Sequence, residues 1–230
     1  MKRTQTKLDD EFYQMEYGLY CSAGDFFLDP LKPCKTAVIT HAHADHATLG
    51  HKEIYCTAGT AALMKARFGN KLNSHFHLKE VHKAFHINGI PISFYNAGHI
   101  LGSVQVLMNL SGKRILYTGD IKTQDDPTCA AYEPVPCDVL VTECTFATPE
   151  HIHPPIQDEI AKLNAYTDIP VIIGCYMIGK AQRISQLIAT HYNNKLVLTH
   201  ANITPYHKVY MQQGIRLENW IPLERFDFAD

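Results

Sequence analysis

The sequence lacks the features that define several broad classes of protein. No apolar stretch within its 230 residues approaches the length of a membrane span, and the opening MKRTQTKLDDEFYQ is too polar for a signal peptide. Its seven cysteines include no C-x-x-C pair, which disfavours both a thiolate zinc site and a disulfide framework. We therefore expect reduced thiols and a cytoplasmic location.

An excess of charge of one sign is also lacking. The chain carries 21 Lys and Arg residues against 23 Asp and Glu residues, for a formal net charge of −2. This balance excludes a basic shell that would bind nucleic acid by charge alone. A polyanionic substrate would have to be held by a local groove or by metal ions.

Short runs rich in Val, Ile, Tyr and Phe are abundant in the first half of the chain and predict a mainly β structure. The predicted strands are 25–30, 36–40, 53–57, 91–97, 104–110, 114–119 and 138–143. Within NLSGKR, Ser111-Gly112 predicts a hairpin turn, and residues 59–69 predict a helix that ends at a glycine.

From about Pro154 the pattern changes to alternating helices and strands. The predicted helices are 154–166, 179–192 and 205–214, and the predicted strands are 195–200 and a buried strand at 169–176. This alternation predicts a parallel βαβ arrangement, with a boundary between the two halves somewhere from Glu143 to Pro155.

Histidine is the informative excess, with fourteen copies, and four candidate metal ligands lie together in HAHADH. His41 and His43 are two residues apart, so in an extended backbone their side chains point the same way. Asp45 and His46 follow as the chain turns. Imidazole and carboxylate ligands together suit Zn²⁺, and also Mn²⁺ or Fe²⁺.

One loop cannot surround an ion, so further ligands are expected from other strand ends. His99 in NAGHILGS and Asp120 in ILYTGD each follow a predicted strand and adjoin a glycine. We predict that His41, His43 and His99 bind one ion, that Asp45 and His46 bind a second, and that the two oxygens of Asp120 bridge them. Such a pair of ions is typical of a two-metal hydrolase.

These residues resemble the metallo-β-lactamase superfamily, whose signature H-x-H-x-D-H stands here as HAHADH. VTECTFATPE and GCYMIGKAQRI resemble motifs of its β-CASP nuclease branch, and the long strings GLYCSAGDFFLDP, NAGHILGS and GDIKTQDDPTCAAYEPVPCDVLVTECTF are similar to bacterial ligase-associated DNA exonucleases. The resemblance implies an α/β fold: the αββα four-layer sandwich over residues 1–145, with two central mixed sheets, and a shortened β-CASP-like α/β portion over 146–230.

The same resemblance implies a function and a set of roles. The function is metal-dependent phosphodiester hydrolysis on nucleic acid, with DNA favoured, as an exonuclease in DNA repair beside a ligase or helicase. His41, His43, His99 and Asp120 would hold the tighter of one or two Zn²⁺ ions, Asp45 would also accept a proton from the attacking water, and Glu143 would support the site by fixing a ligand histidine.

Basic residues give a less specific signal. Lys180 and Arg183 begin a predicted helix, where they would contact a phosphate or simply face solvent, and Lys122 is a comparable candidate for nucleic-acid binding. The histidines between the predicted strands, His51, His75, His77, His82 and His86, are expected mostly at the surface. Trp220 is expected to pack rather than to stack on a base.

One departure from the family pattern keeps alternatives open. Relatives carry a later histidine that completes the second metal site, and this sequence stops at LERFDFAD without it. The sequence is a piece of a longer chain, or the gene product is short, or a partner supplies the group. An RNA-processing nuclease of the same fold, or a catalytically weak nucleic-acid-binding protein, are the remaining alternatives.

Overall fold

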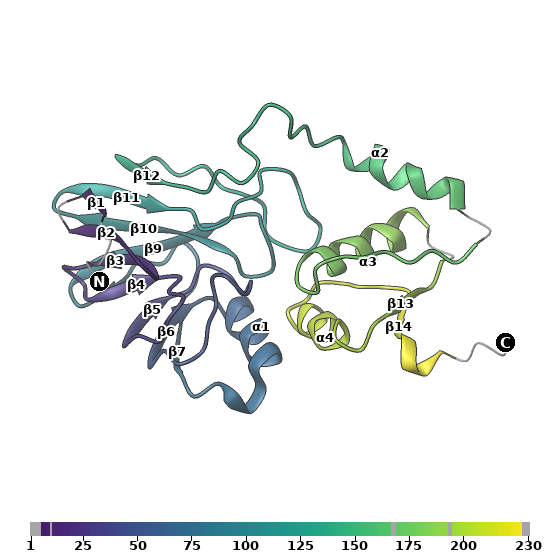
Figure 1. Cartoon of the computed structure of the whole chain (residues 1–230), viewed down its shortest axis with the longest axis horizontal. Coiled ribbons are helices and arrows are strands. Elements are labelled where there is room, and N and C mark those ends of the chain that lie inside the picture. Colours follow the sequence, from purple (N-terminus) through teal and green to yellow (C-terminus); the bar gives the residue numbers. More distant parts are fainter. Residues whose placement is uncertain (1–5, 10, 167–168, 193–194, 227–230) are drawn as a thin grey trace. The chain divides into compact units, whose positions relative to one another are not determined.

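The computed structural model describes residues 6–9, 11–166, 169–192 and 195–226 (Figure 1). The chain divides into two compact units, Met1–Glu143 and Cys144–Asp230. Among the described residues no helix is both long and apolar enough to cross a lipid bilayer.

The first unit begins with a seven-stranded sheet in which neighbours in sequence are neighbours in space. Its pairing is antiparallel from the first strand to the fourth and parallel from the fourth to the seventh. The strands are β1 (Thr6–Asp9), β2 (Phe12–Met15), β3 (Gly18–Cys21), β4 (Phe26–Leu28), β5 (Thr36–Val38), β6 (Glu53–Cys56) and β7 (His75–Leu78).

A second sheet of five strands follows, in the order β12-β11-β10-β9-β8. Only the β11–β12 pair is parallel, so both sheets are mixed. The strands are β8 (Phe85–Ile87), β9 (Ile90–Asn96), β10 (Val104–Leu110), β11 (Lys113–Tyr117) and β12 (Val139–Val141). Ser111 and Gly112 join β10 to β11 with φ angles of 47° and 79°, as a two-residue hairpin requires, which confirms the predicted turn.

One hydrophobic core unites the two sheets. Phe12 and Phe26 from the first sheet and Phe94 and Met108 from the second are fully buried in the same cluster. Each side chain of this size contributes about 1.5–3 kcal/mol by leaving water, so the core favours the face-to-face arrangement of the sheets. The predicted mixed α/β fold is confirmed.

Helix α1 (Ala58–Phe68) connects the first sheet to a loop of the second. Thr57 caps the helix by accepting a hydrogen bond from the Thr60 amide, and its hydroxyl donates to the Gly102 carbonyl at 2.7 Å. Gly69 ends the helix at a φ of 52° and begins the short 3₁₀ helix η1 (Gly69–Lys71), so the helix predicted at 59–69 is confirmed. Gly102 belongs to the loop between β9 and β10, and α1 therefore supports that loop.

The second unit contains a small βαβ element. Strands β13 (Val197–Thr199) and β14 (Trp220–Pro222) pair in parallel, and α4 (Thr204–Gln212) lies between them in sequence. The other elements of this unit are α2 (Ile156–Ala161), η2 (Lys162–Tyr166), α3 (Lys180–His191) and η3 (Leu223–Arg225). A parallel βαβ arrangement is present, but it joins β13, from the predicted strand 195–200, to β14, which was not among the predicted strands.

The buried strand predicted at 169–176 is wrong. These residues form no strand in the structure, and Ile172 is 99% exposed, with Ile169 and Tyr176 also exposed. The β-branched run has the local preference for a strand but pairs with no neighbour in the described part of the chain. The assignment of 146–230 as a β-CASP-like portion stays a prediction.

Candidate metal centre

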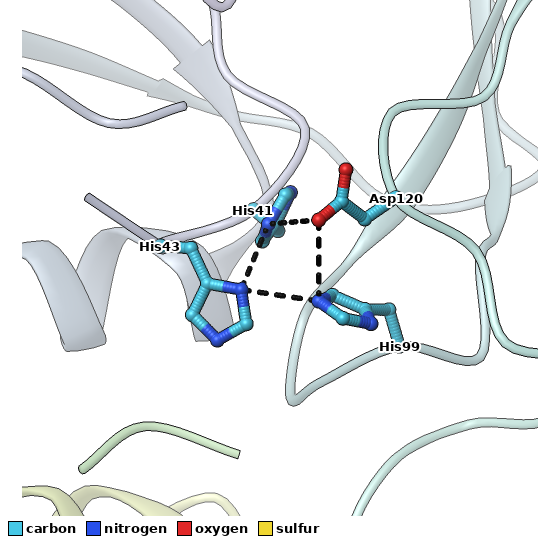
Figure 2. Close-up of side chains that lie close together, drawn as sticks. All are labelled: His41, His43, His99 and Asp120. Carbon is cyan, nitrogen blue, oxygen red and sulfur yellow. Dashed lines mark hydrogen bonds and ion pairs between the residues drawn. The ribbon is translucent and has the colours of Figure 1, made fainter. Parts of the chain in front are cut away.

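Three loops of the first unit bring their side chains to one point (Figure 2). His41 and His43 follow β5, His99 lies in the loop between β9 and β10, and Asp120 follows β11. Each loop leaves its strand at the same end of the paired sheets, so residues far apart in sequence meet there. The sequence predicted that these four side chains would be neighbours, and the structure brings them together.

Ring nitrogens of the three histidines converge. Nδ1 of His43 lies 3.1 Å from Nε2 of His41 and 3.1 Å from Nε2 of His99. The carboxylate oxygen Oδ2 of Asp120 lies 3.7 Å from the former Nε2 and 3.6 Å from the latter. One ligand atom from each of the four residues lies within 4.8 Å of every other, a spacing that a single cation can span.

The second oxygen of Asp120 faces a different partner. Its Oδ1 lies 3.2 Å from Nε2 of His46, and Oδ2 of Asp45 lies 3.8 Å from that same nitrogen. The carboxylate is therefore divided between the cluster of three histidines on one side and the Asp45–His46 pair on the other. This is the arrangement that a bridging carboxylate requires.

The protonation of the cluster follows from its burial and its neighbours. Burial, then the nearby His46, His43 and His99, hold the pKa of His41 well below its usual value. Burial lowers the pKa of His99 to about 4, and His43 adds to that effect. These two rings are therefore neutral near pH 7 and present lone pairs, which is the form that binds a metal ion.

His46 and Asp120 behave differently because they are paired with each other. Burial acts to lower the pKa of His46, but hydrogen bonds to Asp120 and Asp29 outweigh it and raise the pKa to about 10. Burial acts to raise the pKa of Asp120, and the bond to His46 outweighs it and lowers the pKa below its ordinary value. A cation that binds beside His46 must therefore displace a proton from this ring.

Asp29 is a residue of the site that the sequence reasoning missed. Its buried carboxylate accepts hydrogen bonds from Nδ1 of His46 at 2.8 Å, from the Thr40 amide at 2.7 Å and from the Tyr117 hydroxyl at 3.0 Å. Because Nδ1 of His46 is engaged by Asp29, its Nε2 is directed at Asp120. The available signal was an aspartate directly after an apolar strand, in FFLDP, as at Asp120.

Thr40 links Asp29 to His41 through hydrogen bonds. Its hydroxyl donates to Oδ2 of Asp29 at 2.6 Å and lies 3.0 Å from Nδ1 of His41. A hydroxyl has one proton to give, so it must accept from His41. That tautomer carries hydrogen on Nδ1 and leaves the lone pair of Nε2 facing His43 and Asp120. Asp29 therefore orients both His41 and His46.

Asp45 and Glu143 occupy the margins of the cluster. The Asp45 side chain is 74% exposed, so it is accessible to a solvent molecule. Oε1 of Glu143 accepts a hydrogen bond from the Ile121 amide at 2.9 Å and thereby holds the backbone next to Asp120. Glu143 also acts electrostatically on the ligand histidine His99, where its charge raises the pKa against the larger effect of burial. The catalytic roles of both residues stay predictions.

The basic residues predicted to bind nucleic acid have different environments. The ammonium group of Lys122 forms an ion pair with the buried carboxylate of Asp126, within the first unit. Lys180 is exposed at the start of α3, with its Nζ 5.9 Å from the centre of the Tyr176 ring, and Arg183 lies one turn further along. Their binding to nucleic acid stays a prediction.

A cavity of about 500 Å³ opens beside the cluster within the first unit. Five carboxylate residues line it together with His46 and Tyr117, and these are Glu16, Asp29, Asp45, Asp120 and Glu143. A phosphate group would be repelled by such a lining unless cations neutralised it. The acidic cavity and the converging imidazole nitrogens thus fit the same requirement for divalent metal ions.

Paired mixed sheets with histidine and aspartate ligands at their strand ends define a metal-binding site of the metallo-hydrolase type. Residues 24–174 match the family described as "Beta-lactamase superfamily domain". Because this match covers more than half of the chain, the protein belongs to the β-lactamase superfamily, as the resemblance of its motifs indicated. Members of this superfamily typically bind metal ions, and the histidine and aspartate cluster of this chain could hold one.

Curated proteins that are similar in sequence to this chain include nucleases. The chain is 32% identical to a "Probable DNA ligase" of Opitutus terrae over 94% of this chain and 21% of that protein. It is 34% identical to an "RNase J-like protein" of Methanocaldococcus jannaschii over 68% of this chain and 44% of the relative. It is 30% identical to "Endoribonuclease ysh1" of Schizosaccharomyces pombe over 52% of this chain and 16% of the relative. The RNase J-like and ysh1 relatives are homologues in the β-CASP nuclease branch.

The chain spans less than half the length of each of these relatives. A solved structure, "Crystal Structure of a Protein of Unknown Function from Enterococcus faecalis V583", superposes with a TM-score of 0.57 at 14% identity. It covers 84% of this chain and 52% of the other chain. At this identity the likeness supports the fold.

Proposed function

We propose that the protein is a metal-dependent phosphodiesterase acting on nucleic acid, most specifically a DNA exonuclease in DNA repair. The single observation that carries the proposal is the orientation of the Asp120 carboxylate. Its Oδ2 faces His41 and His99, while its Oδ1 faces His46. This geometry supports two adjacent cation positions beside an acidic cavity. The nuclease relatives supply the substrate class.

The donor set fits Zn²⁺, with Mn²⁺ or Fe²⁺ as alternatives, because neutral imidazole and carboxylate suit all three ions. His41, His43, His99 and Asp120 would hold the tighter ion, and Asp45, His46 and Asp120 the second. Bound there, such ions would lower the pKa of a water molecule and offset phosphate charge. Asp45 would accept a proton from that water, and the exposure of its side chain next to His46 supports this role.

Two residues would act by positioning. Asp29 fixes the tautomer of His41, through Thr40, and the orientation of His46. Glu143 holds the Ile121 amide next to Asp120. Lys122, Lys180 and Arg183 remain candidates for contact with the nucleic-acid backbone.

DNA is favoured because the similarity to the "Probable DNA ligase" extends over 94% of this chain. The same relative supports a functional connection with a DNA ligase. A connection with a helicase repair system is what the resemblance to ligase-associated exonucleases implies. RNA is the second candidate, since the "RNase J-like protein" has the higher identity over a shorter stretch.

The test uses end-labelled single-stranded DNA and RNA oligonucleotides of matched sequence. We expect a ladder of products shortened from one end of the DNA, loss of cleavage with a chelator, and recovery when Zn²⁺ or Mn²⁺ is added back. Internal cuts, or a preference for RNA, would favour the endonucleolytic or RNA alternative.

Asp120→Asn sharpens that test. Removing a side chain that only hydrogen-bonds to a metal ligand costs about 10–100-fold in activity or metal affinity. Asp120 is itself the ligand shared by both proposed ions, so its replacement should cost at least that much. Asp125→Asn, at a nearby exposed aspartate, is the matched control and should retain cleavage. Full cleavage by Asp120→Asn would refute the ligand assignment, and binding without turnover by the unaltered chain would support a catalytically weak binding protein.

A further inference from the structure

A second group of metal-ligating side chains lies away from the candidate metal centre, on strands β6 and β7. Glu53 stands opposite His75 in the parallel register, and Tyr55 stands opposite His77. Because residues two apart on a strand share a face, all four side chains lie on one face of the sheet. Strand β7 is the last strand of this sheet, so the group lies at its edge.

The ligand atoms of this group are close together. Nε2 of His77 lies 2.7 Å from Oε2 of Glu53, and the His75 and His77 rings meet edge to face with centres 4.7 Å apart. One ligand atom from each of the three residues lies within 4.8 Å of the others. A small adjustment of side chains would therefore place all three around one ion.

Packing holds the central ring in place. His77 stacks on Tyr55 with ring centres 4.3 Å apart and planes 13° apart, and Tyr55 stacks in turn on Phe85 of β8. The side chains of His77 and Glu53 are 30% and 40% exposed, so they are partly shielded from water but open to an ion. A ring fixed before the ion arrives loses little conformational freedom on binding, which favours affinity.

We propose that Glu53, His75 and His77 form a separate binding site for a divalent transition-metal ion of the zinc class. Two imidazoles and a carboxylate are a ligand set that such ions accept, with water completing the coordination. The ion joins β6 to β7 and secures the exposed edge of the sheet. Lys79, whose Nζ lies 5.5 Å from the Tyr55 ring centre, adds a positive charge nearby and makes this site weaker than the centre at Asp120.

Metal content per chain tests the proposal. The full chain is stripped with a chelator, loaded with excess Zn²⁺, passed through a desalting column and analysed by elemental mass spectrometry. His77→Phe keeps an aromatic ring on Tyr55 but removes the nitrogen ligand, and His75→Gln is a second, independent variant. The control is His86→Gln, an exposed histidine of β8 outside the group.

We expect His77→Phe and His75→Gln each to bind about one ion fewer than the unaltered chain, while His86→Gln binds the same number. The difference should persist in an Asp120→Asn background, because the two sites share no ligand. Zinc should also raise the thermal unfolding midpoint less in His77→Phe than in the unaltered chain. Equal metal content in all four proteins, or an equal loss in His86→Gln, would overturn the proposal.

Discussion

At the scale of single residues, the ligand side chains were visible in the sequence and their supporting partners were not. His41, His43, His99 and Asp120 each follow an apolar run, and that pattern predicted that they would meet. Asp29 follows the same pattern, yet its role depends on contacts with Thr40 and His46 from the loop after β5 and with Tyr117 from β11. Such contacts exist only in the folded protein, so spacing along the sequence cannot predict them.

Asp29→Asn tests this supporting role. An amide cannot accept all the hydrogen bonds that the carboxylate accepts, so the tautomer of His41 and the orientation of His46 should both become less favourable. We expect a fall in zinc affinity of about 10–100-fold, measured by competition with a chromogenic chelator. Asp25→Asn, at an exposed aspartate nearby, should leave affinity unchanged. Unchanged zinc affinity in Asp29→Asn would show that the carboxylate has no such role.

At the scale of elements, prediction succeeded where local preference and pairing agree. The β10–β11 hairpin and α1 carry their own turn and capping residues, so their sequences are sufficient to specify them. The run at 169–176 has the composition of a strand and no strand partner, and β14 has a partner in β13 despite its ordinary composition. Strand pairing depends on residues far apart in the sequence. The run at 169–176 was therefore predicted wrongly as a strand, and β14 was not predicted.

Gly119 shows how the loop before Asp120 depends on close packing. Its φ is 55°, and an added Cβ would lie 2.6 Å from Oγ1 of Thr40. Gly119→Ala should therefore displace Thr40, which orients His41, in addition to adding about 1 kcal/mol of backbone strain. We expect loss of both stability and zinc binding, measured by urea unfolding and metal content.

Gly112→Ala is the matched control for that change. Gly112 also has a positive φ, 79°, but an added Cβ would meet nothing within 4 Å. This variant should lose a similar amount of stability to backbone strain alone and keep its zinc. If both variants kept their zinc equally, the contact of Gly119 with Thr40 would have no bearing on the centre.

At the scale of the whole molecule, the two units carry separate chemistry. The candidate metal centre and the proposed second site at Glu53, His75 and His77 both lie in the first unit, Met1–Glu143. The second unit has a buried polar group of its own: Nδ1 of His207 lies 3.1 Å from the Gln182 amide nitrogen, and its Nε2 lies 2.9 Å from the Ser185 hydroxyl. Since the amide nitrogen can only donate, His207 carries its hydrogen on Nε2 and donates to Ser185. The contact between His207 and Ser185 is therefore structural, and His207 does not act as a base that activates the serine.

We expect the stability of the second unit to decrease in acid because of His207. Burial lowers its pKa to about 4, whereas an unfolded histidine titrates near 6.5. The unfolded chain thus binds more protons between these values, so stability is complete above about pH 6.5 and falls as the pH decreases toward 4. We expect a loss of about 3 kcal/mol from this group.

The fluorescence of Trp220 gives a direct measurement, because it is the single tryptophan and its ring lies 4.8 Å from that of His207. The midpoint of urea unfolding should decrease as the pH is lowered, both in the unaltered chain and in the control His191→Gln, at an exposed histidine. It should decrease less in His207→Gln. The same pH dependence in all three proteins would assign the acid sensitivity to other groups.

The exposed run at 169–176 has a practical consequence for work at high concentration. Val171, Ile172 and Ile173 are consecutive, uncharged and β-branched, and all three are accessible. Segments of this kind assemble into stacked strands with copies of themselves. We therefore expect this stretch to promote self-association at high protein concentration, and we expect Ile172→Lys to reduce it, because a charge opposes strand stacking.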